Sequence, residues 1–61
     1  MDFKLERTDG TPADPPTYRT GVYAWRPGDT IPLGATRTLR VVEVQRDDPE
    51  GPTVLVVEDV A

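Results

Sequence analysis

The sequence predicts one all-β domain, because its prolines leave little room for a helix and its other segments carry strand-forming residues. Seven prolines are spread over 61 residues, and proline breaks the interior of a helix. The spans between them are rich in Val, Thr and Tyr, which pack well on a pleated surface. Asp-Gly and Pro-Gly pairs mark turns between the spans. We therefore expect a small five-stranded antiparallel barrel over residues 1–61, of the SH3-like or OB-like type.

The N-terminal third predicts two strands joined by a turn and a loop. Residues 3–7 alternate apolar and polar side chains, the period of a half-buried strand. Asp9 and Gly10 supply a turn, and residues 11–16 predict an irregular loop. Residues 17–24 predict the second strand, in which Gly21 indicates a bulge or a sharp bend.

The middle of the chain predicts a tight turn and a short edge strand. Residues 26–29 read Arg-Pro-Gly-Asp, with Pro and Gly at the two central positions of a type II turn. Such a turn requires positive φ at Gly28. Residues 30–33 predict a strand at the edge of a sheet, since Pro32 cannot donate a ladder hydrogen bond. Residues 34–36 then turn the chain again.

Residues 37–46 and 53–60 are the two strongest strand segments, and we expect them to pair antiparallel as the centre of the fold. The acidic segment 47–52 suits the loop between them. Both strands are apolar on both faces, whereas a strand with one wet face alternates. Either the strands bend within a small barrel, or the second face packs on another chain. The second explanation predicts a homodimer, slightly favoured over a monomer, with an interface that includes Val42, Val44, Val54 and Val56.

Composition argues against an enzyme. The chain contains no Cys, His, Ser or Asn, so the usual metal ligands and the usual general base are missing. Asp47, Asp48 and Glu50 are the densest acids, but a hairpin tip lacks the walls that shift a pKa. We interpret them as a solvated turn, and we expect no metal and no cofactor.

The charge is acidic overall and unevenly placed. The net charge of −4 disfavours general nucleic-acid binding, which depends on neutralising phosphates. Residues 17–40, however, hold four arginines against Asp29 alone. The longest aliphatic run, residues 54–57, is far shorter than the roughly 20 residues of a membrane helix. With no signal-peptide pattern at the N-terminus, we expect a cytoplasmic protein without a membrane partner.

One group of residues has the chemistry of a recognition surface. Aromatic rings stack on bases, arginines pair with phosphate or carboxylate, and both residue types are enriched in protein-binding hot spots. A purely structural role is the competing interpretation, with Trp25 completing a small core and the arginines pairing with acids across strands. The group comprises Tyr18, Arg19, Tyr23, Trp25, Arg26, Arg37 and Arg40.

The chain also resembles a group of short hypothetical proteins of GC-rich bacteria. The resemblance is carried by residues 25–34, together with residues 7–12, 37–42 and 54–59. It implies a free-standing small protein and no particular activity. The Gly-Asp pair before a short strand is in addition similar to SH3-like barrels in general. We expect a non-enzymatic interaction or accessory module with a protein partner; the alternative is a small-barrel nucleic-acid binder that uses residues 17–40.

Overall fold

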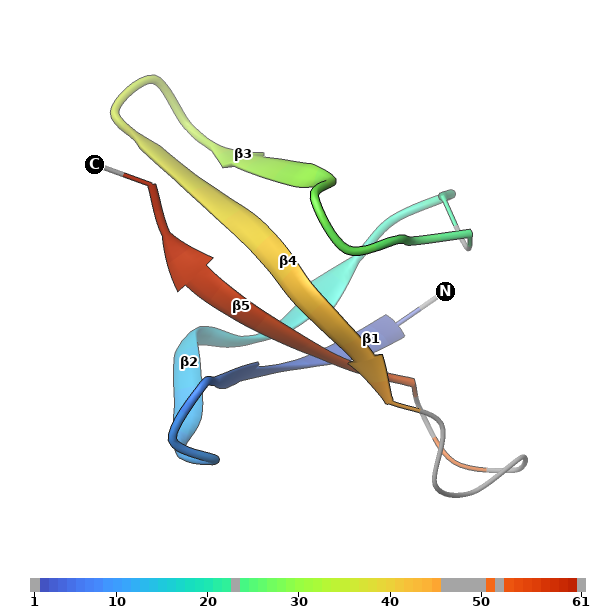
Figure 1. Cartoon of the computed structure of the whole chain (residues 1–61). Coiled ribbons are helices and arrows are strands. Elements are labelled where there is room, and N and C mark those ends of the chain that lie inside the picture. The colour runs from blue at the N-terminus through green and yellow to red at the C-terminus, as the bar shows by residue number, and fades with distance from the viewer. Residues whose placement is uncertain (1, 23, 46–50, 52, 61) are drawn as a thin grey trace.

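Five strands form a single curled sheet (Figure 1). The computed structural model describes residues 2–22, 24–45, 51 and 53–60. The strands are β1 (Asp2–Arg7), β2 (Pro12–Arg19), β3 (Thr30–Leu33), β4 (Arg37–Gln45) and β5 (Val54–Asp59). Their order in the sheet is β2-β1-β5-β4-β3. The all-β prediction with five strands is confirmed.

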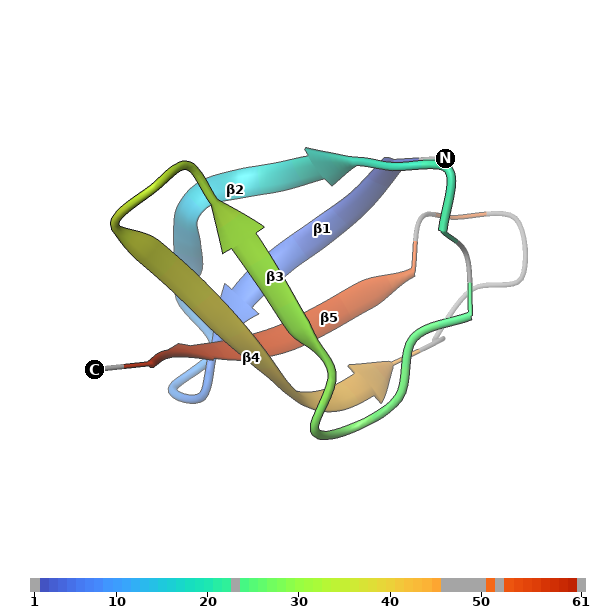
Figure 2. The ribbon, with the colours of Figure 1, turned by 90° about the horizontal axis from the view of Figure 1, so that it is seen from above.

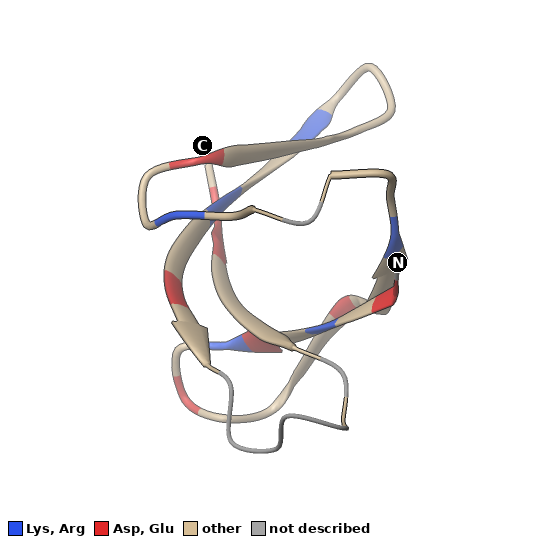
Figure 3. Ribbon diagram, turned by 90° about the vertical axis from the view of Figure 1, so that its right-hand side faces the viewer, with Lys and Arg blue, Asp and Glu red and all other residues tan. Residues whose placement is uncertain are grey.

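The expected antiparallel barrel is wrong in one respect, because the sheet is mixed. β1 and β5 lie side by side and run parallel, while the other neighbouring pairs are antiparallel. Figures 2 and 3 show the sheet bent strongly around its inner side, as a half-barrel with β2 and β3 at its two edges. The curl lets one small sheet enclose its own core without a second layer.

β2 begins earlier than the sequence predicts. The expected loop at residues 11–16 belongs largely to the strand, which ends at Arg19 and leaves Gly21 in a bend beyond it. Lys4 pairs with Thr17, but Glu6 pairs with Pro12, so residues 13–16 lie opposite Leu5 alone. Prolines are tolerated in such an irregular stretch, because its residues do not all have to donate to the neighbouring strand. The Asp14–Pro15 peptide bond within it is cis.

The predicted turn at residues 26–29 is present. Gly28 has φ of 99°, and the backbone N–H of Asp29 donates to the Arg26 carbonyl at 3.1 Å. The Asp29 carboxylate in turn accepts from the Arg26 N–H at 2.9 Å. β3 follows at the edge of the sheet, as Pro32 predicts.

The central hairpin pairs antiparallel as predicted, and it is bent. Val41 pairs with Val57 while Glu43 pairs with Val56, so Val42 is an extra residue in β4. A bulge of this kind bends its strand and reverses which side chains face inward beyond it. Leu55, Val56 and Val57 are all buried. The bent-strand explanation accounts for Val44, which packs against the core, whereas Val54 and Val56 are in register with Lys4 and Glu6 on the outer face of the sheet. The acidic residues of the connecting loop, Asp47, Asp48 and Glu50, lie outside the described residues.

The core fills the inside of the curl. It takes inward-facing side chains from all five strands, with Tyr18, Trp25, Leu33 and Val44 packed at its margins. Its buried members are Phe3, Leu5, Ala13, Ile31, Leu39, Val41, Leu55 and Val57.

We expect the β5 amides to exchange with solvent more slowly than those of any other strand. β5 lies between β1 and β4, and central strands with buried side chains open last. Hydrogen exchange followed by NMR measures this directly. Slower exchange in residues 3–8 than in the β4–β5 hairpin would contradict the assignment of the hairpin as the most stable unit.

Candidate functional site

The aromatic members of the predicted recognition group are part of the core margin. The Trp25 ring lies edge-on to Phe3 and to Tyr18, with ring centroids 6.3 Å apart in each pair. Such edge-to-face pairs stabilise a packed cluster. The indole Nε1 of Trp25 is buried and has no hydrogen-bond partner among the described residues. Trp25 and Tyr18 therefore contribute to the packing of the core margin, and Tyr23 lies outside the described residues.

Three arginines of the group are paired with acids. Arg19 Nε contacts Asp2 at 2.9 Å, Arg37 contacts Asp59 at 3.1 Å, and Arg40 contacts Glu58 at 3.4 Å. The hydrogen bond and the positive charge of Arg19 lower the pKa of Asp2. The Arg26 side chain is exposed beside the turn.

The structure also separates these arginines from one another. Arg37 shares the inward face of β4 with the buried residues Leu39 and Val41, whereas Arg40 faces outward beside Glu58. Arg19 pairs with Asp2 at the start of β1, away from the part of β4 that holds Arg37. The seven residues of the predicted group thus do not form one surface.

One of the four valines of the predicted oligomer interface, Val44, does not share a face with the others. The bulge at Val42 turns Val44 inward, where it packs against the core. Val56 is only 7% exposed and Val54 is half-buried, which leaves Val42 as the exposed member at 41%. The expectation that Val42 and Val44 share a face is wrong, and the apolar argument for a homodimer is correspondingly weaker.

The edges of the sheet are also poor places for association. The predicted edge of the β4–β5 hairpin is covered, since β1 and β3 flank it. Edge strand β2 contains Pro12, Pro15 and Pro16, and edge strand β3 contains Pro32. Proline at an edge removes a donor that a second chain needs for strand pairing. Both edges of the sheet are therefore unfavourable for strand pairing with a second copy of the chain.

We expect Pro32→Val to make the chain self-associate. The Val41 N–H donates to the Asp29 carbonyl, and in an antiparallel pair every second residue directs its backbone N–H and C=O to the neighbouring strand. Leu39 and Arg37 therefore direct these groups to β3. Position 32 lies opposite Thr38, between these hydrogen-bonded pairs, so its backbone nitrogen points away from the sheet. Valine restores an outward N–H there. Sedimentation should give a mass near one chain, 6.7 kDa, for the natural sequence and a mass that rises with concentration for the variant. If the natural chain sediments at twice this mass, the homodimer prediction is supported.

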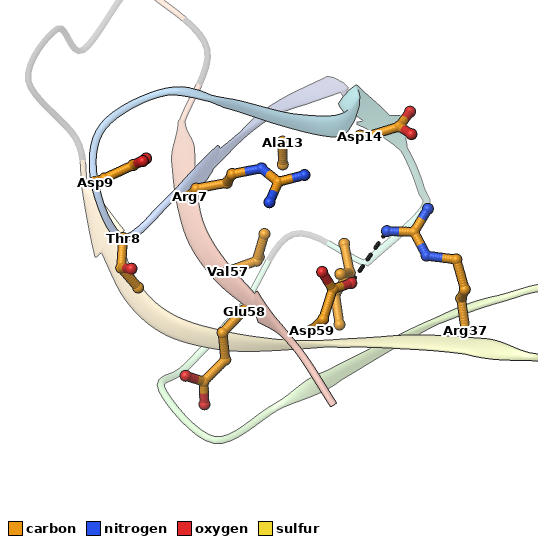
Figure 4. Close-up of a pocket in the computed structure, with 10 residues that line it drawn as sticks. Arg7, Thr8, Asp9, Ala13, Asp14, Arg37, Val57, Glu58 and Asp59 are labelled. Atoms are coloured by element: carbon orange, nitrogen blue, oxygen red, sulfur yellow. Dashed lines mark hydrogen bonds and ion pairs between the residues drawn. The ribbon is translucent and has the colours of Figure 1, made fainter. Parts of the chain in front are cut away.

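One cavity lies at the end of the half-barrel where β1 and β5 finish and β4 begins (Figure 4). Its volume is about 240 Å³. Ala13, Leu39 and Val57 supply apolar surface, and charged residues surround them. We call this cavity the mouth; its lining comprises Arg7, Thr8, Asp9, Ala13, Asp14, Arg37, Leu39, Val57, Glu58 and Asp59.

Three charged residues reach the mouth as continuations of the core rows. Arg7 is the next inward position after Leu5 in β1, and Asp59 is the next after Val57 in β5. Arg37 precedes Leu39 on the inward face of β4. Because strand side chains alternate, the inward rows that carry the core end in two guanidinium groups and a carboxylate. Figure 4 shows Arg7 and Arg37 extending over the cavity from opposite sides.

Most of the acids in the mouth already have partners. Asp59 binds Arg37, and Glu58 binds Arg40. Asp9 accepts the Thr11 hydroxyl at 2.6 Å and the Thr11 N–H at 3.0 Å, and these bonds lower the pKa of Asp9. Arg7 and Asp14 have no ion pair or side-chain hydrogen bond in the described part of the chain.

Sequence reasoning found Arg37 but missed the rest of the mouth. Arg7 was visible as the third residue of the alternating row Phe3, Leu5, Arg7, and it marks where that row leaves the core. Arg7 and Asp59 reach the same cavity because β1 and β5 pair in parallel. This pairing joins the two ends of the chain, and no local sequence pattern indicates it.

Among the described residues, no three His, Cys, Asp or Glu side chains gather in a way that would hold a metal ion. No helix in that part of the chain is long and apolar enough to cross a bilayer. The comparisons with family models, curated proteins and solved structures found no match.

Proposed function

We propose that this chain is a non-catalytic interaction module that docks a protein partner through the mouth. The observation that carries the proposal is the cavity itself, in which inward-facing charges and an apolar floor lie together at one end of the half-barrel. A polar rim around an apolar centre is typical of protein-binding surfaces. Elsewhere the described surface offers few apolar anchors, since Val22 and Val42 are its exposed large hydrophobic residues.

The electrostatics support binding over catalysis. Asp2 and Asp9 have lowered pKa values, caused chiefly by hydrogen bonds from Arg19 and Thr11. A lowered pKa keeps a carboxylate ionised, whereas a general acid needs a raised one. Both side chains are exposed, so neither is held in the dry surroundings that a catalytic carboxyl requires.

Nucleic-acid binding remains the second candidate, and the pairing of its arginines counts against it. Arg19, Arg37 and Arg40 each contact an acid, and basic and acidic residues are interspersed along the strands (Figure 3). Binding of a single-stranded oligonucleotide that disappears by about 0.15 M salt would be non-specific charge contact. The predicted SH3-like or OB-like assignment belongs with this proposal; the partly open OB type agrees better with a sheet that has two edge strands.

Recovery of the tagged chain from its host, compared between two matched variants, tests the docking site. Thr8 and Thr17 are both exposed, but only Thr8 lines the mouth. We expect Thr8→Trp to obstruct the cavity and remove a reproducible partner, while Thr17→Trp keeps it; quantitative mass spectrometry compares the two. Loss of the partner with Thr17→Trp alone would place docking elsewhere, and an identical set of proteins with all three chains would contradict the proposal.

A further inference from the structure

We infer that the mouth binds a carboxylate of its partner, with Arg7 as the main donor and Arg37 as the second. This inference rests on the proposed function and specifies its chemistry. The two guanidinium groups come from strands far apart in the sequence and extend over one cavity from opposite sides (Figure 4). Guanidinium donors hold a carboxylate by paired hydrogen bonds, which makes Arg suited to such recognition.

Arg7 and Arg37 supply hydrogen-bond donors in the mouth that the rest of the chain does not use. A guanidinium offers five N–H groups. Arg7 makes no side-chain hydrogen bond or ion pair in the described part of the chain, although its charge acts on nearby Asp9, and Arg37 spends one bond on Asp59. On the acceptor side, Asp9, Glu58 and Asp59 each accept from a neighbouring side chain. A ligand that accepts hydrogen bonds can therefore use the N–H groups that Arg7 and Arg37 leave free.

The acids around the mouth limit the charge of that ligand. The lining holds two arginines against Asp9, Asp14, Glu58 and Asp59. Like charges at close range repel, so each additional negative charge on a ligand is opposed by the rim. A single carboxylate fits this balance better than a phosphate, which carries close to two charges at neutral pH.

The size and floor of the mouth point to the C-terminal residue of a peptide. The cavity of about 240 Å³ is smaller than the roughly 300–1,000 Å³ of ordinary small-molecule pockets. Ala13, Leu39 and Val57 supply the apolar part of its lining. A C-terminal residue presents its carboxylate beside its own side chain. The occupant we assign is thus a peptide C-terminus with a small apolar last residue.

Titration with N-acetylvaline tests this assignment, with N-acetylvalinamide as the matched probe that lacks the carboxylate. We expect N-acetylvaline to shift the NMR signals of Arg7, Thr8 and Arg37 saturably, with a dissociation constant on the order of 1 mM because the probe is small. The amide should bind at least about tenfold more weakly, since it loses the charge-assisted bonds. Inorganic phosphate should also bind more weakly than N-acetylvaline.

Variants identify the donor. Arg7→Gln should weaken N-acetylvaline about tenfold or more, and Arg7→Lys should weaken it less because it keeps the charge without the fork. Arg19→Gln is the control, since Arg19 is exposed and pairs with Asp2 outside the mouth. The amide spectrum of each variant shows whether it is folded before binding is compared.

Three results would overturn the carboxylate assignment: equal binding of acid and amide, no saturable shift, or unchanged binding by folded Arg7→Gln. None of them would refute docking at the mouth, which the Thr8→Trp and Thr17→Trp comparison tests separately. Conversely, saturable N-acetylvaline binding with no partner lost in Thr8→Trp would support the carboxylate site and refute its role in docking.

Discussion

Leu55→Ala is expected to remove most of the stability of the fold at 25 °C. Leu55 is fully buried in the central strand and belongs to the core cluster. Truncating a buried leucine to alanine costs about 2–5 kcal/mol, because contacts are lost and a cavity remains. A single core in a chain of this length supplies only about 3–5 kcal/mol of stability. Circular dichroism in increasing urea measures the free energy of unfolding.

Val22→Ala is the matched control for this prediction. Val22 is 51% exposed and lies outside the strands, so its truncation should change the free energy of unfolding by less than about 0.5 kcal/mol. If Leu55→Ala were as mild as Val22→Ala, the burial of β5 at the centre of the half-barrel would be wrong.

Local sequence patterns predict most of the strands, because a strand shows an alternation of apolar and polar side chains and is bounded by turn residues. The alternation of Phe3 and Leu5 gave β1, and Pro27-Gly28 with Pro32 gave the turn and the edge strand. The exception is β2, where prolines at positions 12, 15 and 16 predict a loop. The wide register shift beside Leu5 accommodates them, and such a shift depends on the partner strand.

The parallel contact between β1 and β5 could not be predicted in this way. It joins Lys4 to Val54 and Arg7 to Val57, which lie at opposite ends of the chain. Without this contact the sequence predicts an antiparallel barrel, and nothing in it brings Arg7 and Asp59 to the same cavity. The bulge at Val42 had a similar effect, because one extra residue moves Val44 from the outer face to the core.

Composition was a weaker guide to the site than the inward rows of the strands. Trp25 and Tyr18 have the chemistry of recognition, but a small domain needs large side chains to close its core, and both pack there. Arg37 belongs to the basic stretch of residues 17–40. It reaches the mouth because it precedes Leu39 on the inward face of β4. The end of an alternating row is therefore the more specific signal.

Among substitutions that strain the backbone, Gly28→Val is expected to lower the free energy of unfolding most. The φ of 99° at Gly28 lies in a region that L-residues with a side chain rarely adopt. A Cβ there would meet no atom within 4 Å, so the cost of Gly28→Val is conformational and amounts to about 1–3 kcal/mol. The Gly28 N–H donates to the Val41 carbonyl at 2.8 Å. A shift of this turn therefore disturbs the strand that carries fully buried Val41.

Gly34→Val is the informative comparison. We expect a smaller effect there because residues 34–36 form a less defined turn than residues 26–29, although Gly34 also has a positive φ, of 74°. The order is still expected, because 74° lies closer than 99° to the left-handed well near +57°. Gly21→Val serves as the control, since Gly21 has no positive φ and open space around it. Urea unfolding should show the largest loss in free energy of unfolding for Gly28→Val, a smaller loss for Gly34→Val and the smallest for Gly21→Val. An equal or larger loss for Gly34→Val would show that the hydrogen bond from Gly28 to Val41 adds nothing to the stability of the fold.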